Sequence, residues 1–239
     1  MARIIKEQEY CRKRSEILDA AQRLLFTKGY ERMAVQDILA CLKISNGAFY
    51  HYFKSKSELL EALIGRMMQE AEQQLLPIFH DIHMSAMEKL QQYFVTLDRM
   101  RTKGKAFLLS MMHCWYSDEN AIVRQKADEA TIVRRTPLII LIVEQGIREG
   151  VFAVPYSVQT AEVILSLSLS MGNAFARILL STEWVYDEAR IIENIVAANN
   201  AYLEAIERVL GAPSRYLKRL DAGAVREWLE GAEIRKNDN

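Results

Sequence analysis

Apolar residues recur three and four positions apart along most of the chain, which is the period of a helix with one face packed on a core. The apolar run at 138–143 would also fit a buried strand, but its charged, helical flanks favour a helix. The pattern therefore predicts an all-α protein. The predicted helices span residues 10–28, 35–42, a short stretch after residue 45, 55–75, 87–101, 105–115, 120–149, 158–180, 187–210 and 222–230.

Prolines and charges refine these boundaries. Pro77 is expected to end the long helix that begins at Ser55, and Pro137 to kink or divide a later helix. Residues 1–10 are expected to fray, either as a solvated basic tail or as an arm that reaches a DNA minor groove.

The stretch 45–60 has an unusual pattern. Ser45 can cap a very short helix in which Phe49 and Phe53, with Tyr52, fall on one side and can reach a core. A helix this short, with a glycine in its first turn, is poor at holding itself together. Its outward face is aromatic and hydrogen-bonding, which suggests a contact surface held in place by its neighbours. That face consists of Gly47, Tyr50, His51 and Lys54.

A helix start follows directly. Ser55 and Glu58 match a capping box, in which a serine and a glutamate three residues later satisfy the first backbone N–H groups of a helix. Lys54 and Lys56 lie at this joint between the two helices.

Composition alone does not suggest a DNA-binding protein, because 31 Lys and Arg balance 31 Asp and Glu. The distribution changes this picture. Residues 1–60 hold 11 basic against 7 acidic residues, whereas residues 61–239 hold 20 against 24. A basic head on an acidic body is expected when one end meets phosphate.

The three isolated cysteines, Cys11, Cys41 and Cys114, form no C-x-x-C pair and are expected to be free thiols in a reducing cytoplasm. No signal peptide is expected, and the longest uncharged run, 163–176, is too short to span a bilayer.

The segments Gly-Ala-Phe-Tyr-His-Tyr-Phe at 47–53 and Ser-Lys-Ser-Glu-Leu-Leu at 55–60 resemble the recognition helix and following turn of TetR-family transcriptional regulators. Residues 17–30 and 35–38 resemble the family's first two helices, and 146–152 also matches. The resemblance implies a helix-turn-helix domain at 1–60 and an effector-binding, dimerising helical domain at 61–239.

Two departures from the family pattern concern phosphate contacts. The family usually carries a threonine near the start of the second helix; here the chain reads Met33-Ala34-Val35, which has no hydroxyl for that contact to the DNA backbone. The turn between the second and third helices usually holds a small residue or glycine. Here it reads Leu42-Lys43-Ile44, and Lys43 is a candidate to take over a phosphate contact.

Hydroxyls and ammonium groups around the short helix are suited to phosphates, while His51 and Asn46 can hydrogen-bond base edges. The alternative is that the aromatic residues are core and the lysines are merely solvated. The candidate DNA-binding residues are Lys43, Ser45, Asn46, Gly47, Ala48, Tyr50, His51, Tyr52, Lys54 and Lys56.

Aromatic residues and methionines gather between residues 93 and 116, a mixture that suits a cavity for an apolar ligand but equally an ordinary core. The resemblance adds weight to the cavity, because family members often bind small effectors there. The candidate pocket residues are Tyr93, Phe94, Met100, Phe107, Met111, Met112, His113, Trp115 and Tyr116.

Small residues repeat within 158–180 and let two helices approach closely, either inside one chain or across a dimer. The resemblance favours a dimer, because the family usually pairs its last two long helices. The candidate dimer-interface residues are Ser166, Ser170, Gly172, Ala176, Ile195, Asn199 and Tyr202.

Catalytic and cofactor motifs are lacking: the sequence has no P-loop, nucleophile elbow or dinucleotide fingerprint. His80 and His83 could share a helix face, but no third metal ligand accompanies them, so neither a metal nor a cofactor is expected.

These features predict a cytoplasmic, homodimeric, one-component regulator that binds double-stranded operator DNA and a small effector, with no membrane partner. A repressor released by a hydrophobic effector is expected. The alternatives are a regulator whose second domain binds a protein, and an all-α enzyme in which the N-terminal motif is only packing.

Overall fold

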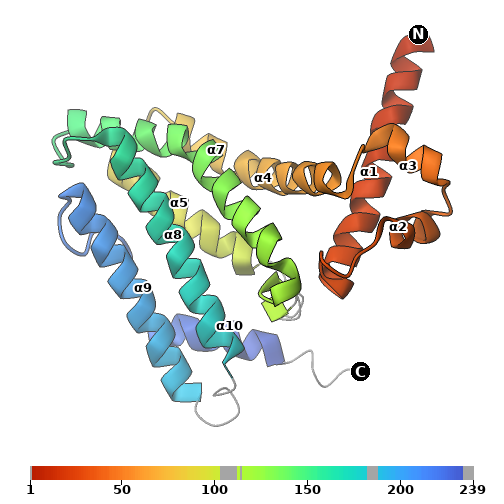
Figure 1. The fold of residues 1–239 in the computed structure, drawn as a ribbon. Helices are drawn as coiled ribbons and strands as arrows, with labels where there is room; N and C mark the ends of the chain where they lie inside the picture. Colours follow the sequence, from red (N-terminus) through yellow and green to blue (C-terminus); the bar gives the residue numbers. More distant parts are fainter. Residues whose placement is uncertain (1, 103–111, 114, 182–187, 234–239) are drawn as a thin grey trace. The chain divides into compact units, whose positions relative to one another are not determined.

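A computed structural model describes residues 2–102, 112, 113, 115–181 and 188–233. Within these residues the chain forms helices and no strand, which confirms the all-α fold (Figure 1). The elements are α1 (Ala2–Lys28), α2 (Val35–Leu42), α3 (Asn46–Tyr52), α4 (Lys56–His80), α5 (Ala86–Thr102), the 3₁₀ turn η1 (Asp118–Asn120), α7 (Ala121–Arg148), α8 (Ser157–Leu180), α9 (Glu188–Leu210) and α10 (Ala222–Glu233).

The chain packs as two compact units. The first contains residues 1–70 and 113–130, and the second contains 71–112 and 131–239. The first unit is therefore discontinuous in sequence: a segment more than 40 residues beyond its N-terminal part returns to complete it. The division at residue 60 remains a prediction about which part of the chain folds by itself.

Most predicted helices match the structure to within a few residues, and two boundaries were wrong. The first helix begins at Ala2 rather than near Tyr10, and α4 continues through Pro77 to His80. Pro77 removes one backbone hydrogen bond. Leu75 and Phe79 on either side are buried in the second unit's core, and their burial stabilises the helix across the proline. The predicted helix at 105–115 lies largely outside the described residues.

Each unit has its own apolar core. In the first unit, α1 to α4 converge on a cluster with the start of α7, which includes Leu25, Ile38, Phe49, Phe53, Leu63 and Val123. The second unit is built from the later part of α4, α5, most of α7, α8 and α9, and its core includes Leu75, Phe79, Tyr93, Ile139, Ile164 and Leu203.

Helix α8 is the one described helix long and apolar enough to cross a membrane by length and composition. A third of its most apolar window is buried inside the chain, and core helices of water-soluble proteins meet the same criterion.

The end of α7 depends on a close approach between a helix and the chain that follows it. Gly150 adopts a positive φ of 72°, and the backbone N–H groups of Val151 and Phe152 both donate to the Gly146 carbonyl. This turn brings the buried Phe152 ring back over α7. A Cβ atom at Gly146 would lie 2.0 Å from the Phe152 ring.

Gly146→Ala should therefore lower the free energy of unfolding by about 1–3 kcal/mol, because the packed Phe152 ring must shift. Gly65→Ala in α4 is the matched control, since a Cβ there meets nothing within 4 Å. It should raise stability by about 0.5–1 kcal/mol through helix propensity. Chemical denaturation of both variants tests this, and equal effects would contradict the proposed contact.

Candidate nucleic-acid interface

The turn between α2 and α3 forms without glycine. Lys43 takes the left-handed conformation at φ 53° and ψ 42°, and the Ile44 N–H donates to the Leu39 carbonyl at 3.1 Å. A residue with a side chain pays about 1–2 kcal/mol for this conformation. The Lys43 side chain is exposed, so the departure from the usual small residue places a positive charge just before α3.

Helix α3 has seven residues and is held from both its ends and its inner face. The Ser45 hydroxyl accepts from the Ala48 N–H at 3.2 Å, as predicted for an N-cap. Phe49 and Phe53 are completely buried in the first unit's core. The outward positions are accordingly exposed, and they include Asn46, Gly47, Tyr50 and His51.

The other predicted DNA-binding residues differ in exposure. Ser45 and Lys54 are exposed, whereas Ala48, Tyr52 and Lys56 are half-buried. The half-buried residues contribute at least part of their surface to the unit itself.

An aromatic cluster joins α1 to the end of α3. The Tyr10 ring lies 4.9 Å from the Tyr52 ring and 5.7 Å from the His51 ring, measured between centroids. Tyr10 thereby limits the orientations open to His51. The sequence analysis missed Tyr10 because it placed the start of the first helix at this residue and predicted no partner for that first turn.

The joint between α3 and α4 is fixed by a variant of the predicted capping box. The Ser55 hydroxyl accepts from the Glu58 N–H at 3.0 Å, while the Glu58 carboxylate accepts from the Lys54 N–H at 2.7 Å. Lys56 turns back to the unit: its Nζ lies 4.2 Å from the Tyr30 ring centroid and 3.5 Å from the Glu31 carbonyl oxygen. Lys56 thus has a packing role in addition to the predicted phosphate contact.

Asp37 compensates for the lack of a side-chain cap at the start of α2. Ala34 is the N-cap and offers no side-chain acceptor. The Asp37 carboxylate accepts instead from the Ala34 N–H at 2.9 Å and from Lys28 Nζ at 2.7 Å. The hydrogen bond from Lys28 and then that from Ala34 lower the pKa of Asp37, so the carboxylate is ionised at neutral pH.

A buried asparagine locks the returning segment onto α1. Asn120 is fully buried, and its side chain accepts from the Tyr30 N–H at 2.7 Å and donates to the Leu25 carbonyl at 3.5 Å. Beside it, the Glu31 N–H donates to the Glu119 carbonyl at 3.1 Å. Nothing in the local sequence pattern marks Asn120, because its partners lie 90 or more residues away.

The predicted pocket residues are divided between the two units. Tyr93 and Phe94 are buried in the second unit's core. Trp115 packs in the first unit, with its ring 6.4 Å from that of Phe26, and Tyr116 lies under the Arg124 guanidinium.

Two further predicted pocket residues, Met112 and His113, have described side chains. Met112 is half-buried against a small cluster in the second unit, and His113 is exposed. The side chain of Met100, and Phe107 and Met111, lie outside the described residues.

The predicted dimer face is also divided. Ser166 and Ser170 are exposed on α8, while Gly172 and Tyr202 are half-buried. The exposed Val163 continues the row formed by the two serines, three and seven positions apart on one helix face.

Three predicted dimer residues are core residues of the single chain. Ala176, Ile195 and Asn199 have exposed fractions of 1%, 5% and 4%. The Asn199 side-chain oxygen accepts from the Leu220 N–H at 3.2 Å, since the chain after α9 folds back over that face. A residue enclosed by its own chain has no surface for a partner, so these three were wrongly assigned.

His80 and His83 do not share a helix face, because α4 ends at His80. The Asp81 carboxylate between them accepts from the His83 N–H at 2.8 Å and so forms part of a turn.

Two family models match parts of this chain. The model of the family described as bacterial regulatory proteins, tetR family, matches residues 17–63. A second model, described as tetracyclin repressor-like, C-terminal domain, matches residues 111–174. The first match spans α2, α3 and the helical segments on either side of them.

Similar proteins are transcriptional regulators. The HTH-type transcriptional repressor BepR of Brucella suis is 24% identical over 84% of this chain and 93% of its own length. The probable HTH-type transcriptional regulator ArpR of Pseudomonas putida is 27% identical over 64% and 74% of the two chains. These relatives, with the family match, favour a regulator over an enzyme.

Solved structures share the fold. The reduced form of NemR from Escherichia coli has a TM-score of 0.52 at 17% identity and covers 84% of this chain and 98% of its own. A regulatory protein of the tetR family from Rhodococcus RHA1 has a TM-score of 0.53 at 20% identity, with the same coverage.

Lys43→Gly separates the shape of the turn from the charge it presents. Glycine relieves the left-handed strain, so the variant should be as stable as the natural chain or up to about 1 kcal/mol more stable. If Lys43 contacts phosphate, affinity should fall equally for specific and random duplexes, and the salt slope should decrease by about one. Lys218→Ala, which removes a charge from the second unit, is the control. Unchanged DNA binding by Lys43→Gly would remove this lysine from the interface.

Proposed function

This chain belongs to the TetR family of transcriptional regulators, and we propose that it is a homodimeric repressor released from its operator by a small apolar effector. One observation carries the DNA-binding part: an exposed, hydrogen-bonding face on a seven-residue helix that two buried phenylalanines and the Ser45 N-cap hold in place. In this proposal His51 and Asn46 contact base edges in the major groove, while Tyr50, Lys54 and Lys43 contact the DNA backbone.

The repressor role draws on the relatives, since BepR and a further relative, DhaR of a Mycobacterium species, are named transcriptional repressors. A repressor acts where the chromosome lies, so we infer a cytoplasmic protein. Binding to DNA excludes RNA polymerase or a competing activator without any catalytic step.

Effector release requires a physical connection between the two units. Helices α4 and α7 each contribute their first turns to the first unit and their later turns to the second. Soon after entering the second unit they are joined by Glu72 and Arg134, with two hydrogen bonds of 2.6 and 2.7 Å. The hydrogen bonds from Arg134 lower the pKa of Glu72, so the pair is ionised at neutral pH. A change in packing around Tyr93 and Phe94 would be transmitted through this pair.

A dimer is needed because two recognition helices must reach successive major grooves, about 34 Å apart. The proposed interface is the exposed row on α8 that contains Val163, Ser166 and Ser170. Small side chains there allow close approach of a second copy.

The effector proposal is tested by screening small hydrophobic compounds for thermal stabilisation, then measuring operator affinity by fluorescence anisotropy with each compound that binds. Affinity should fall about 5–150-fold at saturation, and operator DNA should weaken compound binding by the same factor. Compounds that bind while operator affinity stays constant at saturation would refute this mechanism.

Glu72→Gln should reduce that coupling factor while leaving compound binding intact, because the link between α4 and α7 is weakened. Glu61→Gln is the control: its carboxylate also lies on α4 and faces Lys126 at 3.7 Å, but this exposed pair belongs to the first unit. Equal coupling in both variants would exclude the Glu72–Arg134 pair as the connection.

Val163→Arg should convert the dimer to monomers at micromolar concentration, because it buries an unpaired charge in the interface, and operator affinity should fall accordingly. Val133→Arg is matched, since Val133 is 73% exposed on α7 and outside the proposed face. Sedimentation velocity reports the mass of each variant. A natural chain that sediments as a monomer and still binds the operator with full affinity would contradict the dimer.

A further inference from the structure

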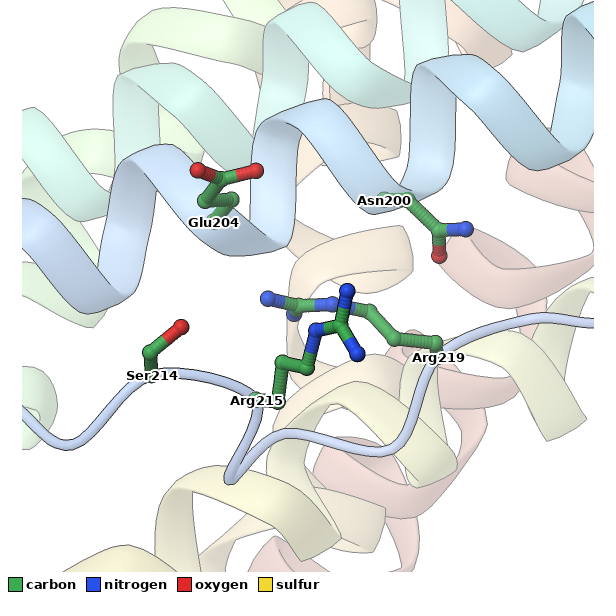
Figure 2. A pocket seen from close by; sticks show the side chains of 5 residues that line it. All are labelled: Asn200, Glu204, Ser214, Arg215 and Arg219. Atoms are coloured by element: carbon green, nitrogen blue, oxygen red, sulfur yellow. The ribbon is translucent and has the colours of Figure 1, made fainter.

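The chain that follows α9 forms a polar cavity together with α9. None of its lining residues belongs to the effector pocket predicted between residues 93 and 116. The cavity has a volume of about 400 Å³ and is lined by Asn200, Glu204, Ser214, Arg215 and Arg219 (Figure 2). All five residues belong to the second unit, two from α9 and three from the connection between α9 and α10.

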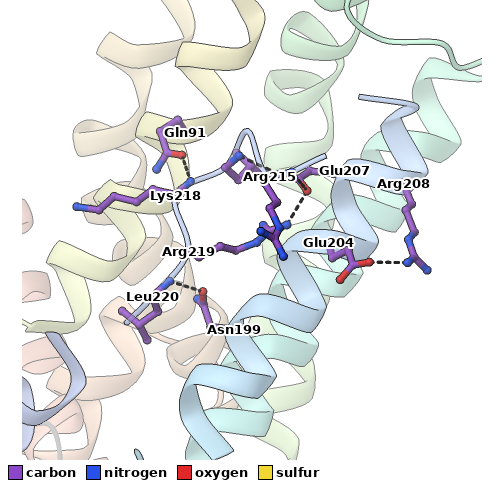
Figure 3. A network of polar contacts seen from close by, with 10 residues as sticks. Gln91, Asn199, Glu204, Glu207, Arg208, Arg215, Lys218, Arg219 and Leu220 are labelled. Carbon is purple, nitrogen blue, oxygen red and sulfur yellow. Dashed lines mark hydrogen bonds and ion pairs between the residues drawn. The ribbon is translucent and has the colours of Figure 1, made fainter. Parts of the chain in front are cut away.

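This connection is held rigidly by side chains that bind its backbone (Figure 3). The buried Glu207 carboxylate accepts from the Arg215 N–H at 3.0 Å and from the Leu217 N–H at 2.8 Å. Farther along the connection, the Gln91 side chain accepts from the Lys218 N–H at 2.6 Å. The Asn199 side chain accepts from the Leu220 N–H at 3.2 Å. The walls of the cavity are therefore fixed before any ligand arrives, which lowers the entropic cost of binding.

The cavity has one positive charge in excess. Arg219 is neutralised by Glu207 at 2.6 Å, and Glu204 by Arg208 at 2.5 Å. Arg215 is exposed and forms no ion pair with any described residue. Its backbone is held at a φ of 61°, a strained conformation for arginine, and such strain is found preferentially at functional sites.

Two enclosed polar atoms around the cavity also lack partners. Within the described part of the chain, no hydrogen bond reaches Arg219 Nη1 or Asn200 Oδ1. Leaving a buried donor or acceptor unpaired is costly, so native structures rarely do so without a bound partner. An anion that lies between the two guanidinium groups would give Nη1 its acceptor, whereas Asn200 Oδ1, itself an acceptor, would need a donating ligand group such as a hydroxyl.

From these features we propose that the cavity binds a small monocarboxylate, held between Arg215 and Arg219 with Ser214 and Asn200 as neutral hydrogen-bonding groups. Guanidinium groups match the planar, two-oxygen geometry of a carboxylate. A single negative charge balances the excess, whereas a dianionic phosphate would leave an uncompensated charge near Glu204. The polar lining is unsuited to an apolar effector. The cavity is therefore a second ligand site, separate from the effector pocket predicted between residues 93 and 116.

The test uses the full chain and lactate as the probe, with lactamide as its neutral analogue, at constant ionic strength maintained with chloride. Titration calorimetry should show saturable lactate binding and none for lactamide. Tighter binding of inorganic phosphate than of lactate would overturn the monocarboxylate assignment. Absence of saturable lactate binding would overturn the site.

Arg215→Asn is the informative variant. Asparagine tolerates the left-handed backbone conformation, and the Arg215 N–H remains available to Glu207, so the connection should stay folded. Lactate affinity should fall about tenfold or more, because a charge-assisted hydrogen bond is lost. Lys218→Asn removes an equal charge from the same connection outside the cavity and should retain lactate binding. Equal losses in the two variants, or none in Arg215→Asn, would overturn the proposal.

Discussion

The burial of Phe49 and Phe53 is the interaction on which the rest of the first unit depends. A seven-residue helix is too short to be stable alone, so α3 exists because its inner face is completely enclosed by α1, α2 and α4. With stability supplied from inside, the outer face is free to carry the exposed, hydrogen-bonding residues that we propose contact DNA. The left-handed Lys43 and the capped Ser55 set the direction in which the chain enters and leaves this helix. The proposed DNA-binding surface is thus a product of the core packing beneath it.

The same unit is completed by residues from much later in the chain. Asn120 occupies a buried position at the end of α1, where it binds the Leu25 carbonyl of α1 and the Tyr30 N–H of the loop that leads to α2. The segment that carries Asn120 continues into α7 and so into the second unit. Two helices, α4 and α7, therefore each contribute residues to both units.

The sequence allowed most helices to be predicted, because helical periodicity and caps such as Ser45 and Ser55 are local signals. Features that depend on distant contacts were missed. Asn120 and Tyr10 matter through partners on other helices, and Pro77 is tolerated because the core around it stabilises α4. The small residues of α8 predict close helix packing, but only the structure distinguishes the exposed Ser166 from the buried Ala176. Periodicity identifies that a residue packs, and not which chain it packs against.

The central claim is that the exposed face of α3, presented twice by a dimer, recognises a symmetric operator. A nuclease footprint of the full chain on the DNA upstream of its own coding sequence tests this most directly. The account predicts two protected half-sites related by two-fold symmetry, with centres one helical turn, about 10 base pairs, or a multiple of it apart. No protection at concentrations that bind random duplex, or one protected site without a symmetric partner, would contradict it.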